Sequence, residues 1–152
     1  QDLKYKLICI KLRLLDKERS FLKNKDKNKM MIEFMENKII QYDHALSCPN
    51  IDYIKKIHLF LFLTKVPYFF NFYKKDNSNK PLEFPIKDSY PDFKAIDQFI
   101  KFIYTDLLPD SKVVFENLNF FKQISEKLWY GKSNPLKVWV DKIGNLKNSE
   151  YL

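Results

Sequence analysis

The segment FKAIDQFIKFIYTD, residues 93–106, constrains the fold of this chain more than any other. Apolar residues recur at helical spacing within it and just beyond its end, at Phe93, Ile96, Ile100, Ile103 and Leu107. Phe99 and Phe102 widen this stripe until apolar side chains nearly encircle the segment. A helix of this kind must be covered on most sides, so we expect it at the centre of the domain.

Sequence signals delimit this central helix at both ends. Ser89 followed by Asp92 is a variant of the capping box. Pro91 is compatible with a first helical turn, because its missing N–H would have no partner there. The Leu-Pro-Asp sequence at 108–110 indicates the end of the helix.

The composition is that of one globular domain, or of a domain with an arm. Hydrophobic residues make up 45% of the 152 residues and aromatic residues 16%, which is enough for one core. The only glycines, Gly131 and Gly144, are too far apart to form a phosphate-binding loop. Cys9 and Cys48 make no disulfide framework, and no apolar run approaches a membrane span. We therefore expect an intracellular protein, cytoplasmic or nuclear, without a membrane partner.

The formal charge of +8 raises the question of a nucleic-acid partner. The excess of lysine is concentrated only in KNKDKNK, which supplies Lys23, Lys25, Lys27 and Lys29. Asp26 interrupts this run and no aromatic residue lies within it, which favours a solvated loop over a phosphate-binding arm. A nucleic-acid-associated subunit is therefore kept as an alternative.

Residues 1–46 are expected to form a helical arm with a basic loop, in which residues 17–29 are a loop or a frayed helix end. For residues 3–15 we favour a helix over a strand, with one apolar face made of Leu3, Leu7, Ile10 and Leu14. A second helix is expected at 30–46, with an apolar stripe that includes Met31, Phe34, Met35 and Ile39. Residues 47–50 then indicate a turn and a domain boundary.

The remaining chain alternates short strands and helices. We expect a short buried strand that runs into a helix at 57–63, and further short strands at 82–86 and 113–115. Besides the central helix, we expect helices from Pro67 to a solvated loop at 74–80, from 117 to 130, and from 135 to 144. Gly131 is expected to close the second of these, Asn134 and Pro135 to open the third, and Gly144 to end it.

Residues 47–146 resemble a degenerate BTB/POZ domain. IHLFLFLTKVPYF, residues 57–69, is similar without a gap to the family's Ala-His-Lys…Leu…Ser-Pro-Tyr-Phe segment. LEFPIKD resembles the short strand that follows, FKAIDQFIKFIYTD the helix that ends Ile-Tyr-Thr-Gly/Asp, and NLNFFKQISEKLWY with PLKVWVDKI the final helix pair. The resemblance implies a mostly helical α+β fold, in which a helical cluster is flanked by a small sheet. Residues 147–152 would be a frayed tail.

The sequence departs from the family around its hallmark histidine, His58. Val66 stands where the family usually has Ser, Leu59 where it has a basic residue, and Ile57 where it has Ala. We expect the stretch between Cys48 and Ile57 to be too short for the family's usual strand hairpin. Residues 5–12 could then supply the missing strand.

The resemblance implies a non-enzymatic protein-interaction module that mediates homo- or hetero-oligomerisation, including recruitment to a cullin-type ubiquitin ligase scaffold. The expected partner-binding residues are Tyr73, Lys74, Leu82 and Asp106. In the family an N-terminal helix usually makes the dimer contact, a role that Met31, Phe34, Met35 and Ile39 would take here. The expected structural residues are His58, Tyr68, Phe69 and Tyr104. The third interpretation, a purely structural helical subunit of a larger complex, predicts that the short strands at 59–63 and 82–86 are absent.

Candidates for chemistry are few. His44 and His58 have no Cys or carboxylate neighbours at metal-ligand spacing. Asp88, Asp92 and Asp97 lie around a helix start, where negative charge is favoured for electrostatic reasons alone. We therefore expect no catalytic residue, no metal and no cofactor.

Overall fold

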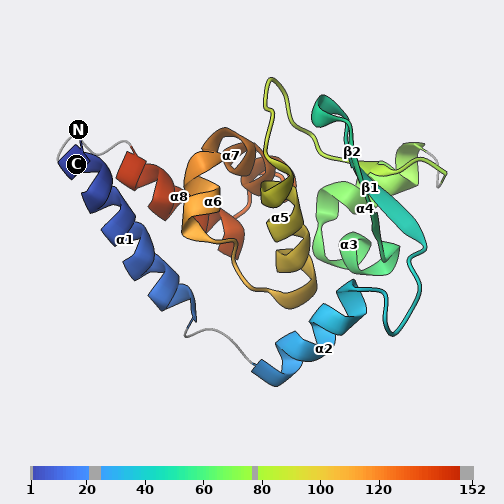
Figure 1. The fold of residues 1–152 in the computed structure, drawn as a ribbon. Coiled ribbons are helices and arrows are strands. Elements are labelled where there is room, and N and C mark those ends of the chain that lie inside the picture. Colours follow the sequence, from blue (N-terminus) through green and yellow to red (C-terminus); the bar gives the residue numbers. More distant parts are fainter. Residues whose placement is uncertain (1, 21–24, 77–78, 148–152) are drawn as a thin grey trace.

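The computed structural model describes residues 2–20, 25–76 and 79–147 (Figure 1). The helices are α1 Asp2–Ser20, α2 Lys25–Met35, α3 Leu59–Lys65, α4 Pro67–Asp76, α5 Phe93–Thr105, α6 Ser111–Glu116, α7 Leu118–Lys127 and α8 Pro135–Lys147. The strands are β1 His44–Cys48, β2 Tyr53–Ile57 and β3 Leu82–Glu83, and a 3-10 turn, Pro49–Ile51, links the first two. The expected mostly helical α+β class is confirmed.

The central helix is found where it was predicted, as α5. It buries most of its length in the core, through Ala95, Ile96, Phe99, Ile100, Phe102, Ile103, Tyr104 and Thr105. The predicted capping box is wrong, because Asp92 lies at the N-cap without a side-chain hydrogen bond to the helix. Its carboxylate instead accepts from Asn117 Nδ2 at 3.3 Å. The helix ends at Asp106, which takes a left-handed conformation with φ 59°.

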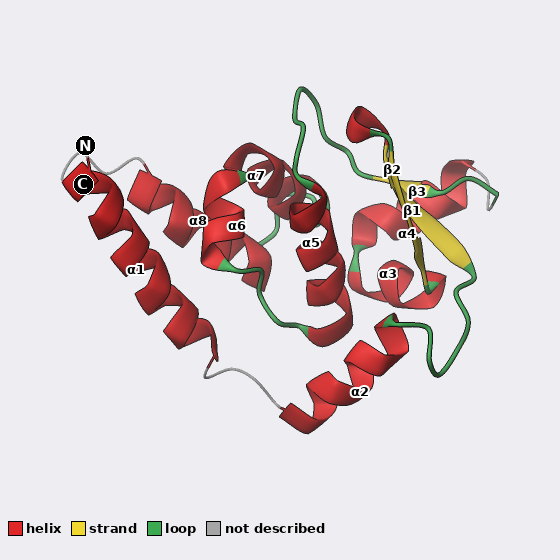
Figure 2. Ribbon diagram, viewed as in Figure 1, coloured by secondary structure: helices red, strands yellow, loops and turns green. Residues whose placement is uncertain are grey.

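The sheet contains a strand hairpin that the sequence did not predict (Figure 2). β1 lies between β2, to which it is antiparallel, and β3, to which it is parallel. Asp52, with φ 54°, makes the sharp turn that lets the hairpin fit into the short stretch before Ile57. Residues 5–12 lie in α1 and supply no strand. Of the two strands whose absence would mark the purely structural helical subunit, the one at 59–63 is replaced by α3 and the one at 82–86 is present only as Leu82–Glu83.

The predicted helix over residues 30–46 is wrong in its second half. The α2 helix ends at Met35, and Asn37 then takes a left-handed conformation with φ 67°. The side-chain oxygen of Asn37 accepts from the backbone N–H of Tyr42 at 2.7 Å, which turns the chain toward β1. The expected boundary between residues 46 and 47 falls inside β1. Of the segment 17–29, expected as a loop or a frayed helix end, residues 17–20 complete α1 and residues 25–29 already belong to α2.

The predicted strand at 57–63 passes into a helix earlier than expected, and the predicted strand at 113–115 is helical. β2 ends at Ile57, His58 is extended, and α3 begins at Leu59, so the apolar run 57–63 changes structure near its start. A short continuous apolar run has no period that separates strand from helix. Residues 113–115 lie in α6, which Asp110 caps by accepting from the Lys112 N–H at 2.9 Å. The third predicted strand shrinks to Leu82–Glu83.

The last two helices follow their sequence signals except at the end. Beyond α7, Tyr130 donates to Lys127 and Gly131 to Glu126, the pair of bonds typical of the Schellman motif. Asn134 caps α8 as predicted, since its side-chain oxygen accepts from the Lys137 N–H at 2.9 Å. Gly144 does not end this helix. It lies buried within α8, which continues to Lys147, while the expected tail beyond that residue lies outside the described residues.

The α1 helix packs against α6 and α8 (Figure 1). Its inner face contributes Ile8 and Leu12 to the core. The predicted helix is confirmed, and the apolar face recognised in its sequence, Leu3, Leu7, Ile10 and Leu14, is exposed. α1 has two apolar faces, and the spacing alone does not tell which of them meets the domain.

Candidate functional site

The α2 helix is fixed to the domain by its own apolar stripe. The Phe34 ring lies 4.2 Å from the His58 ring and 5.9 Å from the Tyr104 ring, measured between ring centroids. Met31 and Met35 are likewise partly buried against the core. Three of the four residues expected at a dimer interface therefore contact their own domain, and the fourth, Ile39, is exposed.

His58 joins three parts of the chain. Its Nε2 lies 2.6 Å from the carbonyl oxygen of Ile40, and its Nδ1 lies 2.6 Å from the hydroxyl of Tyr104. A carbonyl oxygen can only accept, so Nε2 carries the proton and Nδ1 accepts from Tyr104. Both ring nitrogens are thus engaged in holding α5, the start of α3 and the segment after α2 together.

Tyrosine hydroxyls around this centre resist ionisation. Burial raises the pKa of Tyr104 to about 12. Burial, together with the charge of Glu36, also raises the pKa of Tyr42, whose hydroxyl donates to the Met35 carbonyl. The hydroxyl of Tyr53 on β2 donates to the carboxylate of Asp97 on α5, and burial followed by this contact raises its pKa. Hydroxyls that stay protonated keep their role as donors.

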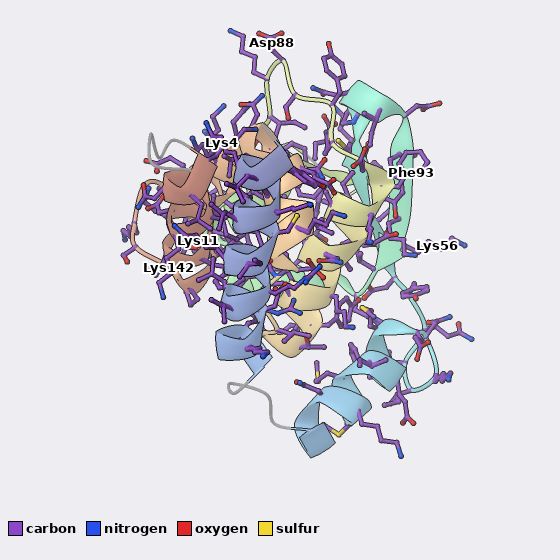
Figure 3. The ribbon with its side chains drawn as sticks, turned by 60° about the vertical axis from the view of Figure 1, so that its left-hand side comes forward. Lys4, Lys11, Lys56, Asp88, Phe93 and Lys142 are labelled. Carbon is purple, nitrogen blue, oxygen red and sulfur yellow. The ribbon has the colours of Figure 1, made fainter. Side chains whose placement is uncertain are left out.

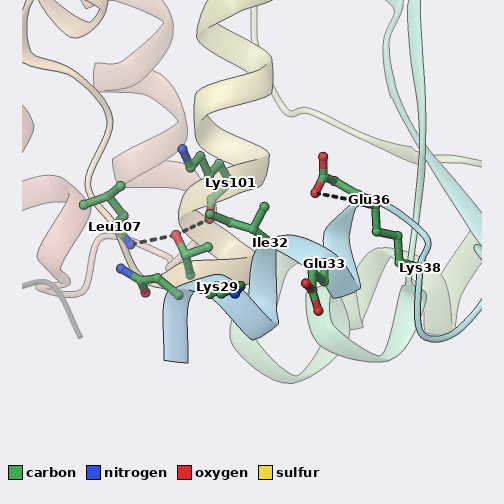
Figure 4. Close-up of a pocket in the computed structure, with 9 residues that line it drawn as sticks. Lys29, Ile32, Glu33, Glu36, Lys38, Lys101 and Leu107 are labelled. Atoms are coloured by element: carbon green, nitrogen blue, oxygen red, sulfur yellow. Dashed lines mark hydrogen bonds and ion pairs between the residues drawn. The ribbon is translucent and has the colours of Figure 1, made fainter. Parts of the chain in front are cut away.

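A groove of about 380 Å³ lies between α2 and the C-terminal end of α5 (Figure 4). Its lining consists of Asn28, Lys29, Ile32, Glu33, Glu36, Lys38, Lys101, Thr105 and Leu107. Positive and negative side chains are mixed there, with Lys38 3.7 Å from Glu36. Such a surface favours no single sign of ligand charge.

The four predicted partner-binding residues are not gathered into one site. Leu82 is fully buried in β3, and Tyr73 packs edge-on against His44. Lys74 is exposed at the end of α4, with its ammonium 5.1 Å from the Phe70 ring centroid. Asp106 lies at the end of α5, where Lys65 donates to it at 3.3 Å.

The lysines of the nucleic-acid alternative are divided by the fold. Lys23 lies outside the described residues. Lys25 and Lys27 belong to the first turn of α2, and Lys29 is exposed at the groove. The predicted basic loop is therefore in part a helix.

Of the expected structural residues in α4, Phe69 is fully buried and Tyr68 is partly buried. The Tyr68 ring stacks on Phe72 with 6.3 Å between centroids, and it lies at the same distance from Tyr130. Among the residues that the structure describes, no group of three or more His, Cys, Asp or Glu is placed to hold a metal ion. No helix in the described ranges is long and apolar enough to cross a membrane.

Comparisons with protein-family models and with curated proteins return no match.

Beside α2 lie three exposed apolar residues, Ile39, Ile40 and Phe60, which we call the α2–α3 corner. Sequence reasoning named Ile39 for a dimer interface but missed Ile40 and Phe60. All three side chains are more than half exposed, and Phe60 is the most exposed at 76%. The Ile40 carbonyl is bonded to His58, and Phe60 follows His58 by two residues, so the cluster surrounds one point of the fold. A helical interpretation of residues 59–65 would have placed Phe60 opposite the buried Phe62.

Proposed function

We propose that this chain is a non-enzymatic protein-interaction module of the BTB/POZ type that mediates oligomerisation. The observation that carries the proposal is the β1–β2 hairpin, which leads directly into His58 and then into the α3–α4 pair. A strand hairpin before this histidine is part of the family's pattern, and the sequence alone had suggested that it was missing. The later order of β3, α5 and the α7–α8 pair also agrees with the order of the resembling segments.

The α2–α3 corner is the surface that we assign to assembly. Ile39, Ile40 and Phe60 each expose more than half of their side chains near His58, and exposed apolar area gathered in one region is typical of interaction sites. Met31 and Phe34 then have a supporting role, because they hold α2 on the domain and so fix the shape of the corner. This division of roles replaces the simpler expectation that the whole stripe faces a partner.

Recruitment to a cullin-type scaffold has less support than assembly. In the family that contact uses an apolar-x-Glu motif in the loop after the aromatic helix. Here the corresponding sequence is KKDNSNK, residues 74–80, which is basic and lacks the motif.

Light scattering on size-exclusion fractions, over a range of protein concentrations, tests self-association. We expect a dimer that dissociates on dilution, and a shift to monomer in the double variant Ile39→Glu with Phe60→Glu, because charge at the corner cannot be buried without a partner charge. Tyr90→Glu is the matched control, since Tyr90 is equally exposed but lies in the segment before α5. A monomer at every concentration, or a dimer that persists unchanged in the double variant, would overturn assembly through the α2–α3 corner.

A further inference from the structure

The α1 helix carries a second apolar face that no part of the described chain covers. Ile8 and Leu12 on its inner face are 9% and 4% exposed, whereas Leu3, Leu7, Ile10 and Leu14 are 70%, 38%, 50% and 59% exposed. This outer set, which we call the α1 seam, runs along the helix away from α6 and α8. It lies apart from the α2–α3 corner, so the inference does not depend on the proposed function.

The spacing of the α1 seam is that of a coiled coil. Its members follow one another at intervals of four, three and four residues, which is the alternation of a and d positions in a heptad. The next such position is occupied by Lys17, so the seam ends at Leu14 after about three turns. Burying its side chains against a partner helix would remove apolar surface that folding leaves in water.

Cations border the α1 seam on both sides. In the heptad frame, Lys4 and Lys11 occupy the e positions and Lys6 and Arg13 the g positions (Figure 3 labels the first two). All four side chains are exposed, and within the described residues none has an ion-pair partner. Residues at e and g select the partner of a coiled coil through their charges.

We propose that the α1 seam docks an acidic amphipathic helix of another protein. A second copy of α1 would place cations against cations in either orientation, so the charges select against self-pairing. A lipid surface would need a broad apolar face, whereas here charged residues lie directly beside a stripe of a/d width. Glutamates at the e and g positions of a partner helix would complement the four cations.

The seam is held ready for a partner by the inner contacts of α1. The Asp16 carboxylate accepts from the Ser111 hydroxyl at 2.7 Å and from the Ser111 N–H at 3.0 Å. The Arg19 guanidinium donates to the Leu108 carbonyl at 2.7 Å. A helix that is already formed and anchored loses less conformational freedom on binding than a disordered segment would.

Two synthetic helical peptides test the proposal on the whole chain. Both carry Leu at a and d, but one has Glu at every e and g position and the other has Lys. We expect fluorescence anisotropy to show binding of the Glu peptide only, weakened by salt, and weakened at least about tenfold in the variant Leu7→Ser with Ile10→Ser. The matched control, Val138→Ser, removes an exposed apolar side chain from α8 and should bind as the unaltered protein does.

Circular dichroism of the Leu7→Ser, Ile10→Ser variant should be unchanged, because both side chains lie outside the core. Failure of the Glu peptide to bind, or equal binding of both peptides, would overturn the proposal. Vesicles of phosphatidylserine and phosphatidylcholine form a separate arm. If the protein co-floats with these vesicles but does not bind the Glu peptide, the α1 seam binds a lipid surface and the proposal is wrong.

Discussion

The hydroxyl of Tyr104 lies 2.6 Å from Nδ1 of His58 and 3.0 Å from the backbone nitrogen of the same residue. One buried hydroxyl therefore donates to the histidine ring and accepts from its backbone, across 46 positions of sequence. The pair joins the central helix to the chain that leads from the sheet into α3. Removal of the hydroxyl would leave two buried polar groups of His58 without a partner.

We expect Tyr104→Phe to lower the free energy of unfolding by about 1–3 kcal/mol, the usual cost of leaving buried hydrogen-bonding groups unpaired. Urea titration followed by circular dichroism would measure this loss. Tyr5→Phe is the control, since Tyr5 is exposed on α1, and it should leave the urea midpoint unchanged. Equal midpoints for Tyr104→Phe and the unaltered protein would show that the contact contributes nothing.

Stability should fall at alkaline pH through Tyr104. The pKa of an unfolded tyrosine is about 10, and burial raises the pKa of Tyr104 to about 12 in the folded protein. Between these values the unfolded chain loses a proton that the folded one retains, so ionisation favours unfolding as pH rises. The stabilising contribution is complete below about pH 10 and is lost as pH approaches about 12.

Urea titrations across this alkaline range, on the unaltered protein and on Tyr104→Phe, would measure that contribution. The difference in free energy of unfolding between the two proteins should narrow as pH rises. Tyr53 is a second tyrosine with a raised pKa, and the variant Tyr53→Phe tests it in the same way. Parallel curves for the unaltered protein and Tyr104→Phe would refute the assignment.

The two glycines should respond to alanine in opposite directions. A Cβ at Gly144 would lie 3.4 Å from Lys122 Cε and 3.9 Å from the Leu118 methyls, which is ordinary contact. Because Gly144 lies within α8, Gly144→Ala should stabilise the protein by about 0.5–1 kcal/mol. Gly131 has φ +77°, so Gly131→Ala should destabilise it by a similar amount. Thermal melts of both variants would test this pair, and a shift in the same direction would contradict it.

Asp16 should anchor α1 to the domain. Asp16→Ala removes the acceptor of the Ser111 N–H and one of the two acceptors of the Ser111 hydroxyl, which also donates to the Leu12 carbonyl at 3.0 Å. We therefore expect the free energy of unfolding to fall by about 1–2 kcal/mol. If the substitution loosens α1 locally, the backbone amides of α1 should exchange hydrogen faster than those of α5. Asp141→Ala, an exposed carboxylate on α8, is the control. Unchanged protection of α1 in the Asp16 variant would mean that Ile8 and Leu12 suffice to hold it.

Sequence reasoning succeeded where a long apolar period had clear ends and failed where the decision depended on tertiary contacts. The period through Ile96, Ile100 and Ile103 predicted α5 well. The end of α2 depends on a local feature that the apolar period does not reveal, the left-handed conformation of Asn37 and its bond to Tyr42. Residues 59–65 have no periodicity that separates a helix from a strand. They are helical because β2 ends just before them.

The candidate surfaces were harder to predict than the fold. The stripe with Met31 and Phe34 was identified correctly as apolar, but a pattern cannot tell a face that meets its own domain from one that meets a partner. The same ambiguity holds for the two apolar faces of α1, where Leu7 is outward and Leu12 inward. Burial in the folded chain resolves this choice, and spacing does not.

The bond between Asp16 and Ser111 spans 95 positions of sequence, which has a consequence for synthesis on the ribosome. At about 5–20 residues per second, Ser111 is made roughly 5–20 s after Asp16. During that interval α1 has no α6 or α8 to cover Ile8 and Leu12, so both of its apolar faces are open at once. A chaperone that binds apolar helices would meet α1 in this window, before the domain that later shields half of it exists.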